Sequence, residues 1–374
     1  MMALLSKPVR HRPQFHPLTV AGVEPLTDDA AAITFAVPEE LREEFTFAPG
    51  QHLTLRVERD GQEQRRSYSI CLSRKAAADR GVLRVAAGRV AGGAVSPWLV
   101  DEVRPGDTIE VMPPLGSFVV PTEPDRARHH VAIVAGSGIT PVLSLLTTVL
   151  EDEPGSRVTL LFGNRSTSSI MFLEELEDLK NLYRSRFQLM HVLSREARDV
   201  DLFSGRLDEE RLRRIFDSLV PVDTVDEWYL CGPFSLVENA REVLAAEGVA
   251  NEHVHFEVFH VDDEPRAETD PGVGAAGERT GVLARVTVNL DGRTTEIAMT
   301  DPGETILAAT LRARPDAPYS CTGGVCGTCR ARLVEGEVRM DRNYALEEDE
   351  VADGIVLACQ SRPVTDHVRL DYDA

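Results

Sequence analysis

The sequence predicts a multidomain protein in which an antiparallel β-barrel, a doubly wound parallel α/β domain and a smaller α+β domain follow one another. Three observations support this fold class. Short β-rich runs recur from about residue 17 to 120, strands alternate with amphipathic helices from about residue 130, and four of the six cysteines fall in the last 54 residues. A chain of 374 residues is also too long for one ordinary core, so several domains are expected.

The composition argues against several classes of protein. A formal net charge of −21 disfavours a nucleic-acid-binding protein, which would need a basic face, and also attachment to anionic membranes. No apolar run approaches the roughly 18–20 residues that span a bilayer. The start, MMALLSKPVRHR, places a few apolar residues before the basic ones, the wrong order for a signal peptide. We therefore expect a cytoplasmic protein, whose acidic surface would also suit a basic protein partner.

The barrel is predicted for residues 14–124, because its β-rich runs are separated by turns and not by long helices. The runs are LTVAGVE, AAITFAV, HLTLRVE, RRSYSI, VLRVAAG and DTIEVM, with one helical interlude at 96–100.

Residues 125–260 alternate buried strands with helices, which is typical of a parallel sheet with helices on both faces. The expected strands are HHVAIVAG, RVTLLFG, RFQLMHVLS, WYLCG and HVHFEVF, and the expected helices are TPVLSLLTTVLED, FLEELEDLKNLY, DEERLRRIFDSL and FSLVENAREVLAAEG. Residues 261–281 are rich in Pro, Gly, Ala and acids without periodicity, which indicates a linker. The last domain, 282–374, begins with a hairpin around Asp291–Gly292.

Four cysteines near the end of the chain have the spacing of an iron–sulfur site, C-x4-C-x2-C followed by a fourth cysteine after 29 intervening residues. This spacing holds a [2Fe–2S] cluster. The expected ligands are Cys321, Cys326, Cys329 and Cys359. Gly323, Gly324 and Gly327 would let the backbone wrap closely and aim amides at the sulfurs. The alternative is a structural zinc site, although zinc sites usually present two separate cysteine pairs.

A basic, an aromatic and a hydroxyl residue on an expected barrel strand predict a flavin site. Arg66, Tyr68 and Ser69 are expected on one strand face, where Arg66 would neutralise a pyrophosphate, Tyr68 would pack on a ring and Ser69 would hydrogen-bond the flavin edge. Ser67 belongs to the same motif.

About 25 residues downstream, a glycine turn lies where a strand gives way to a helix. Its amides, with Ser96 as the helix cap, would form an anion site. The candidate contacts in this turn are Gly92, Gly93, Val95 and Ser96. Either motif alone also fits an ordinary barrel surface, and it is their spacing within one barrel that favours a flavin.

A second glycine turn, AGSGITP, joins the first expected parallel strand to a helix. Gly136 and Gly138 would permit a tight turn and the close approach of a phosphate, with Thr140 as cap and Pro141 in the first helical turn. Glycines also occur in such turns for geometry alone.

A later strand ends in Cys231, Gly232 and Pro233, at the carboxyl edge where doubly wound sheets bind ligands. A buried cysteine there is structural by default. With a phosphate at the first turn, a small polar side chain at this one would suit an extended dinucleotide.

The turns after the next two strands favour NADPH over NADH. Arg165 follows one strand, and Ser194 and Arg195 follow the other, whereas NAD sites place a ribose-binding acid in this region. Glu196 comes next in the chain but does not occupy the turn directly. The alternative is that these arginines are solvated loop tips, so NADH remains possible as donor.

In this order, RSYS, GGAVS, AGSGITP and CGP resemble the ferredoxin-NADP reductase superfamily, and CTGGVCGTC…C resembles its fused plant-type ferredoxin. The resemblance covers nearly the whole chain after the first dozen residues. It implies an FAD-binding barrel, a nicotinamide domain and a β-grasp ferredoxin domain that carries the [2Fe–2S] cluster.

The resemblance also implies roles for individual residues. Ser69 would lie near flavin N5 and Cys231 near the nicotinamide, while Arg66, Tyr68 and the turn at 93–96 would contact FAD. Glu257 and Phe259 match the E-V-aromatic ending of plant-type reductases, in which the aromatic ring shields the flavin. The implied catalytic residues are Ser69, Cys231 and Glu257. The segment 194–196 is similar to the family's 2′-phosphate motif, whereas Val90–Ala91 departs from the Val-Lys of many relatives, a charge for which Arg89 could substitute.

The stretch from Cys321 to Pro363 is similar to the reductase components of multicomponent phenylacetyl-CoA epoxidases, whose oxygenase carries a di-iron centre. This similarity implies electron transfer from NADPH through FAD and the cluster to an oxygenase partner. Three alternatives remain. They are a reductase of a Rieske ring-hydroxylating or steroid hydroxylase system that uses NADH, a stand-alone flavin reductase or diaphorase, and a zinc-stapled nucleotide-binding module.

Overall fold

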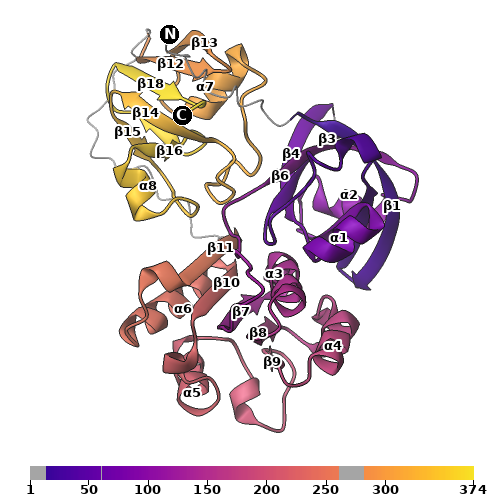
Figure 1. Cartoon of the computed structure of the whole chain (residues 1–374). Helices are drawn as coiled ribbons and strands as arrows, with labels where there is room; N and C mark the ends of the chain where they lie inside the picture. Colours follow the sequence, from indigo (N-terminus) through magenta and orange to yellow (C-terminus); the bar gives the residue numbers. More distant parts are fainter. Residues whose placement is uncertain (1–13, 60, 261–281) are drawn as a thin grey trace, which may run out of the picture. The chain divides into compact units, whose positions relative to one another are not determined.

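The computed structural model of the chain describes residues 14–59, 61–260 and 282–374 (Figure 1). The described residues fall into two compact units, the first holding 16–260 and the second 282–374. The linker expected at 261–281 lies outside the described residues.

Six antiparallel strands form the first sheet, in the order β4-β3-β6-β1-β2-β5. They are β1 (His16–Thr27), β2 (Ala30–Ala36), β3 (His52–Arg59), β4 (Gln62–Ser69), β5 (Val82–Gly88) and β6 (Thr108–Leu115), with helices α1 (Arg74–Arg80) and α2 (Ser96–Asp101). A bridge between Ile70 and Val85 joins the two edge strands and closes the barrel. Phe35, Leu53 and Leu55 are fully buried inside it. The predicted antiparallel barrel is confirmed, whereas α1 was not predicted.

Five parallel strands form the second sheet of the same unit, in the order β11-β10-β7-β8-β9. The strands are β7 (His129–Ala135), β8 (Arg157–Asn164), β9 (Phe187–Leu193), β10 (Glu227–Pro233) and β11 (Val254–His260), and the helices are α3 (Ile139–Asp152), α4 (Leu173–Leu182), α5 (Glu209–Ser218) and α6 (Phe234–Ala246). The strand order reverses between β7 and β10. The carboxyl ends of these two strands therefore flank the crevice in which doubly wound sheets bind ligands.

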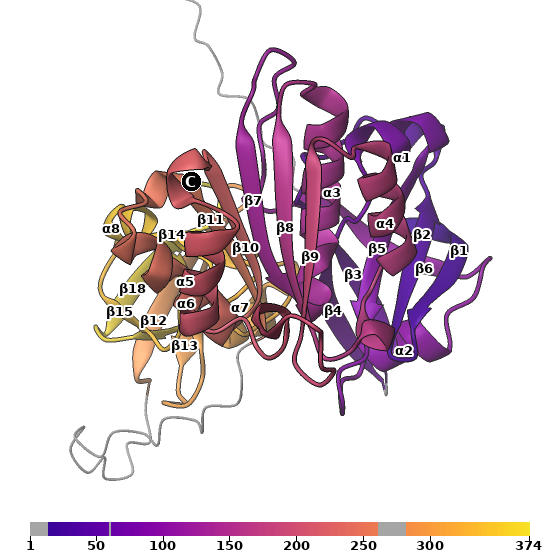
Figure 2. The same cartoon turned by 90° about the horizontal axis from the view of Figure 1, so that it is seen from below.

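Helices cover both faces of this sheet, with α3 and α4 on the face toward the barrel and α5 and α6 on the other (Figure 2). One apolar core combines Leu143 and Phe162 of the α/β layer with Ala32, Ala86 and Phe118 of the barrel segment. The barrel and the parallel sheet are therefore packed into a single unit by apolar burial.

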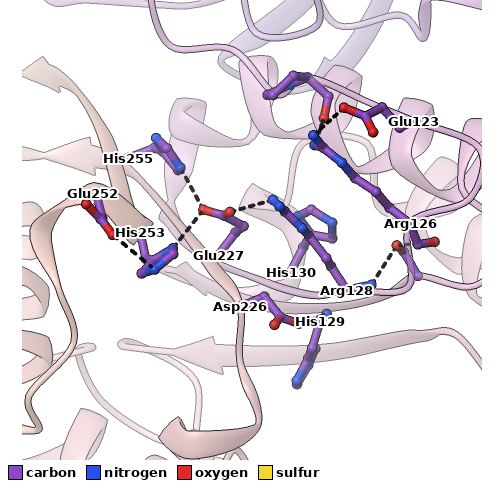
Figure 3. Close-up of polar contacts among 12 residues, drawn as sticks. Glu123, Arg126, Arg128, His129, His130, Asp226, Glu227, Glu252, His253 and His255 are labelled. Atoms are coloured by element: carbon purple, nitrogen blue, oxygen red, sulfur yellow. Dashed lines mark hydrogen bonds and ion pairs between the residues drawn. The ribbon is translucent and has the colours of Figure 1, made fainter.

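A charged network lies at the amino edge of the parallel sheet, opposite the ligand-binding edge (Figure 3). Glu227 accepts hydrogen bonds from Arg128 at 2.6 Å and from His255 at 3.0 Å, and His253 Nδ1 lies 3.7 Å away. Burial alone would raise the pKa of Glu227, but the hydrogen bond from His255 and the nearby positive charges lower it. The network ties the start of β10 to that of β11, the strand that carries Glu257 at its middle.

The second unit is a mixed sheet in the order β13-β12-β18-β14-β16, in which β12 and β18 are parallel, beside a small β15–β17 pair. Its elements are β12 (Ala284–Leu290), β13 (Arg293–Met299), α7 (Ile306–Ala313), β14 (Arg330–Glu335), β15 (Val338–Met340), α8 (Glu348–Ala352), β16 (Ile355–Leu357), β17 (Ser361–Pro363) and β18 (His367–Asp371). Asp291 and Gly292 both have positive φ, at 54° and 66°, as a tight two-residue hairpin turn requires. The expected hairpin and the β-grasp fold class are confirmed.

Candidate flavin, nicotinamide and iron–sulfur sites

The expected flavin residues lie on β4, at the edge where the barrel closes. The register pairs Tyr68 with Leu53 and Ser69 with His52, without a bulge. Because side chains alternate along a strand, Arg66 and Tyr68 share one face and Ser69 lies on the other. The prediction that all three share a face is therefore wrong, since Tyr68 and Ser69 are consecutive residues.

Arg66 and Tyr68 together have the chemistry of a flavin nucleotide site. The Arg66 guanidinium donates to the Arg65 carbonyl oxygen at 2.7 Å and to Gln64 Oε1 at 3.2 Å, and no described carboxylate pairs with it. Burial raises the pKa of Tyr68 above its ordinary value, so the phenol is neutral although Arg66 opposes this shift. An uncompensated positive charge beside a neutral ring fits a pyrophosphate attached to an aromatic ring system. Ser67, on the other face, lies with its hydroxyl 3.3 Å from that of Thr54.

The glycine turn between β5 and α2 is present, but Ser96 does not cap the helix. Val95 is the N-cap residue, and Ser96 is the first residue of α2. The Ser96 hydroxyl accepts a hydrogen bond from the Val90 amide at 3.1 Å, so it braces the turn. Gly92 has a φ of 72°, and a Cβ on Gly93 would lie 3.1 Å from the Val90 carbonyl oxygen. The Gly93 amide donates to the Val90 carbonyl oxygen at 3.0 Å, so this amide and the serine hydroxyl are both engaged within the turn.

Arg89 precedes this turn with its charge already paired. Its guanidinium donates to Asp101 at 2.7 Å and lies 3.6 Å from Asp29. This pairing argues against Arg89 as the substitute for the lysine of relatives.

The nicotinamide turn connects β7 to α3 and packs directly on the end of β10. Gly136 has a φ of 54°, as a tight turn requires. A Cβ on Gly138 would lie 2.3 Å from the Cys231 carbonyl oxygen, so only glycine fits there. The physical role of Gly138 is thus close packing of two turns, where the sequence had suggested room for a phosphate. Gly232, with a φ of 146°, completes this contact.

Thr140 also differs from its expected role as a cap. The N-cap of α3 is Gly138, and the Thr140 hydroxyl donates to the Ser137 carbonyl oxygen at 2.9 Å inside the first turn. Pro141 is the third residue of α3 and therefore lies in the first helical turn, where it was expected, and Pro233 is the last residue of β10.

Cys231 and Glu257 are brought together at the carboxyl edge of the sheet. They are partner residues on the adjacent parallel strands β10 and β11, so their side chains lie on one face. Burial raises the pKa of Glu257 to about 8, and its Oε2 is buried without a hydrogen-bond partner. Burial and the neighbouring Glu257 raise the pKa of the Cys231 thiol. Phe259 lies two residues further on the same strand and packs against the core that contains Cys231.

At neutral pH this arrangement presents a protonated carboxyl group and a neutral thiol on the sheet face toward the barrel. Both are uncharged, and Glu257 has an unused hydrogen-bonding oxygen. Such a pair of uncharged groups fits a ligand with polar edge groups, such as a nicotinamide.

The side chains expected at a 2′-phosphate gather at the ends of β8 and β9. The Ser194 amide donates to the Asn164 carbonyl oxygen at 2.9 Å, and the Arg195 amide donates to that of Arg165 at 2.7 Å, so the two turns are locked side by side. Both arginines and Ser194 are exposed there. Arg165 lies 3.7 Å from Asp29, a pair exposed on both sides and thus weak.

Glu196 engages this edge more directly than the sequence suggested. Its carboxylate accepts hydrogen bonds from the amide and the hydroxyl of Thr167, each at 2.8 Å, which lower its pKa. The acid is thereby turned toward the β8 loop, and the arginines remain available at the surface.

The four C-terminal cysteines form a loop suited to a two-iron cluster. All six cysteines of the chain are free of disulfides. The thiols of Cys321 and Cys326 are within hydrogen-bonding reach of each other, and so are those of Cys329 and Cys359. Two sulfurs for each of two irons is what a [2Fe–2S] cluster needs.

Backbone amides in this loop point at the sulfurs, as the glycines predicted. The Gly323 amide donates to Cys321 Sγ at 3.4 Å, and that of Gly324 donates to Cys359. Gly324 and Gly327 have φ of 82° and 65°, which glycine adopts without strain. These residues fit the cluster.

The sequence analysis missed two features of the first unit, His52 and the polar contacts of α3. His52, opposite Ser69, is buried with Nε2 unpartnered, and burial lowers its pKa to about 4. Ser144 and Thr148 on α3 bond to the barrel. The available signal for the α3 contacts was the spacing of two hydroxyl residues by four in a mostly apolar helix.

Three sequence families match consecutive parts of the chain. An oxidoreductase FAD-binding domain matches residues 17–120, an oxidoreductase NAD-binding domain 132–242, and a 2Fe-2S iron-sulfur cluster binding domain 288–364. One of the subunits of 1,2-phenylacetyl-CoA epoxidase from Escherichia coli K12 is 43% identical over 360 residues, covering 96% of this chain and 98% of that protein. The chain belongs to the ferredoxin-NADP reductase superfamily, with a C-terminal 2Fe–2S domain.

Other relatives of this reductase are similar over most of its length. The ferredoxin reductase component of 3-ketosteroid-9-alpha-monooxygenase from Rhodococcus rhodochrous is 34% identical over 95% of this chain and 96% of that protein. The solved structure of phthalate dioxygenase reductase matches with a TM-score of 0.56 at 25% identity, over 96% of this chain and 98% of the other.

The reductase is therefore an oxidoreductase that uses FAD, a nicotinamide dinucleotide and a [2Fe–2S] cluster to serve an oxygenase. In the described residues, no helix is long and apolar enough to cross a membrane.

Proposed function

We propose that this reductase passes electrons from NADPH to the di-iron oxygenase of a phenylacetyl-CoA epoxidase, in the cytoplasmic breakdown of phenylacetate. The observation that carries the proposal is the 43% identity to a component of the Escherichia coli 1,2-phenylacetyl-CoA epoxidase, which extends over 96% of this chain and 98% of that protein. A cytoplasmic location supplies both the reduced nicotinamide and the reducing conditions that keep thiols free.

We assign FAD to residues 14–124, the nicotinamide to 125–260 and the cluster to 282–374. When bound, FAD converts the two-electron chemistry of a nicotinamide into the one-electron chemistry of an iron–sulfur cluster. Arg66 and the turn at 92–96 hold the pyrophosphate, and Tyr68 and Phe259 cover the ring system. The uncompensated charge of Arg66 supports this assignment.

Cys231 and Glu257 bind and orient the nicotinamide in this proposal. Glu257 holds a proton on its carboxyl group at pH 7, because burial raises its pKa to about 8. It can therefore donate a hydrogen bond where an ordinary glutamate would accept one. The neutral Cys231 thiol adds no charge beside the reacting ring, and Ser69 contacts the flavin edge from β4.

NADPH is the proposed donor because Arg165, Ser194 and Arg195 are exposed together at the edge expected for a 2′-phosphate. The proposed cluster ligands are Cys321, Cys326, Cys329 and Cys359, supported by their pairing and by the amides that point at them.

Reconstitution tests the proposal. The purified protein is mixed with NADPH, oxygen, phenylacetyl-CoA and the purified oxygenase component of a phenylacetyl-CoA epoxidase, and epoxide formation is measured against NADPH consumed. Coupled formation is expected, with NADH at equal concentration giving a lower rate. NADPH oxidation without epoxide would contradict the partner, and a higher rate with NADH would contradict the donor.

A second candidate is a reductase for a steroid monooxygenase, favoured by the 34% identity to the 3-ketosteroid-9-alpha-monooxygenase component over 95% of this chain. Faster electron delivery to that oxygenase than to the epoxidase in the same assay would favour it.

A further inference from the structure

Three polar side chains lie along one face of α3, a helix whose buried residues are mostly apolar. Ser144 and Thr148 are fully buried, and Asp152 follows at the same spacing of four residues, so the three lie on one helical face. The neighbouring residues Leu143, Leu145 and Leu146 belong to the apolar core. Burying a hydroxyl group without a partner is unfavourable, so each of these groups needs one.

All three side chains bond to one short segment of the barrel. The Ser144 hydroxyl donates to the Leu72 carbonyl oxygen at 2.5 Å. The Arg74 amide donates to Thr148 Oγ1 at 3.3 Å, and the Arg74 guanidinium donates to Asp152 at 2.5 Å. We call these five residues the polar seam. It joins two turns of α3 to the segment that follows β4.

Each side of the seam leads to a proposed reacting partner. On the barrel side, Leu72 follows Ser69 by three residues, with the bridge of Ile70 to Val85 between them. On the other side, α3 begins directly after Gly138, where a Cβ would lie 2.3 Å from the Cys231 carbonyl oxygen. Figure 2 shows α3 between the parallel sheet and the barrel. The helix is thus a rigid connection between the flavin strand and the Cys231 turn.

We propose that Ser144 and Thr148 are positioning residues for hydride transfer, because the seam sets the separation between the flavin held by β4 and the nicotinamide held at the Cys231 turn. The inference rests on the proposed function. In the reaction the nicotinamide ring of NADPH loses a hydride, which carries two electrons, to the flavin and leaves as NADP⁺. Neither hydroxyl touches the reactants. Their effect comes through distance, since a displacement of about 1 Å can slow such a step about 100-fold.

The chain offers matched variants for a test. Ser144→Ala and Thr148→Val remove a seam hydroxyl, and Thr148→Ser keeps the hydroxyl while removing a methyl group. Thr147→Val is the control, because Thr147 is the next residue on the same helix and its Oγ1 is buried without a partner. The same substitution at 147 and 148 thus separates the hydrogen bond from packing.

The first measurement is the single-turnover rate of flavin reduction at saturating NADPH without oxygen, together with the long-wavelength charge-transfer absorbance of the complex. Ser144→Ala and Thr148→Val are expected to slow reduction about tenfold and to weaken the absorbance. Thr148→Ser and Thr147→Val should match the wild type. Equal rates at saturation for Ser144→Ala and Thr147→Val, or an effect on NADPH affinity alone, would overturn the proposal.

The second measurement is amide hydrogen exchange, which does not depend on turnover. Ser144→Ala and Thr148→Val should speed exchange both in residues 70–74 and in the turn at 136–140, and Thr147→Val in neither. Unchanged exchange at 136–140 would contradict the coupling. If wild-type flavin is reduced by neither NADPH nor NADH, the proposed function fails, and exchange still decides whether the seam connects the two segments.

Discussion

At neutral pH Glu257 holds a proton that most glutamates would have lost, because burial raises its pKa to about 8. The carboxyl group lies beside the Cys231 thiol, and its Oε2 has no partner in the described residues. An uncharged hydrogen-bond donor can orient a nicotinamide without attracting the positive charge of the oxidised product. The burial that costs the protein a solvated carboxylate thus produces a group suited to the reaction.

We expect the rate of flavin reduction by NADPH to fall as pH rises through about 8, because Glu257 then loses its proton. The fall is roughly tenfold, below the roughly 100-fold to 10,000-fold contributed by an acid that transfers a proton, because Glu257 only orients the ring. Stopped-flow reduction between pH 6.5 and 9.5 measures it. Glu257→Gln keeps a neutral donor and should give a flat profile in this range, so a pH step that persists in this variant would assign the titration to another group.

Burial of His52 lowers the stability of the protein at acid pH. An unfolded imidazole has a pKa of about 6.5, and burial lowers that of His52 to about 4. Between these values the unfolded chain binds more protons, so the free energy of unfolding falls as pH drops from about 6.5 to 4, by about 1.4 kcal/mol per unit. Urea unfolding at pH 7, 6 and 5 should show a shallower loss for His52→Gln. The exposed His367 is the control, and a similar change in slope for His367→Gln would contradict the assignment.

At the scale of elements, alternation of residue types was sufficient to predict the strands and most helices of the first unit and the hairpin of the second, but not β14 to β18. VLRVAAG and HHVAIVA became β5 and β7, because β-branched and apolar runs between turns have few other ways to be buried. The positions of helix caps were harder. Ser96 and Thr140 are residue types that often cap helices. However, the N-caps of α2 and α3 lie one and two residues earlier, and both hydroxyls bond within the turn.

Contacts between elements distant in the chain could not be read from the sequence. The hydroxyl spacing of Ser144 and Thr148 marks a polar helix face without saying what covers it. Only the folded unit shows that Leu72 and Arg74 do. Gly138 is similar, since its lack of a side chain is explained by the carbonyl of Cys231, a residue more than ninety positions away.

Gly138→Ala should therefore disturb two turns at once. The new Cβ would lie 2.3 Å from the Cys231 carbonyl oxygen, which is backbone and cannot move aside. We expect a loss of about 2 kcal/mol in the free energy of unfolding of the first unit, with weaker NADPH binding. Gly88→Ala is the control, because nothing lies within 4 Å of the Cβ it would add. Equal stability and NADPH affinity in the two variants would show that the turns are not packed as described.

At the scale of the whole molecule, the two units divide the reaction between them. The proposed flavin and nicotinamide residues lie within residues 16–260, and the four expected cluster ligands within 282–374. Each unit has its own apolar core. A change confined to one unit should therefore leave the chemistry of the other intact.

Cys329→Ser separates the two functions in the full chain. Cys329 is buried in the core of the second unit and pairs with Cys359, so its loss should remove the iron from the purified protein. Flavin reduction by NADPH should stay within about twofold of the wild-type rate, whereas electron delivery to the oxygenase should fall at least about 100-fold, because the one-electron carrier is gone. Iron content, stopped-flow reduction and epoxide formation measure the three quantities. Cys71→Ala is the control, since Cys71 is equally buried but lies in the first unit, and it should keep the iron. Full delivery by an iron-free Cys329→Ser protein would mean that the flavin reaches the oxygenase directly and that the cluster is not on the path.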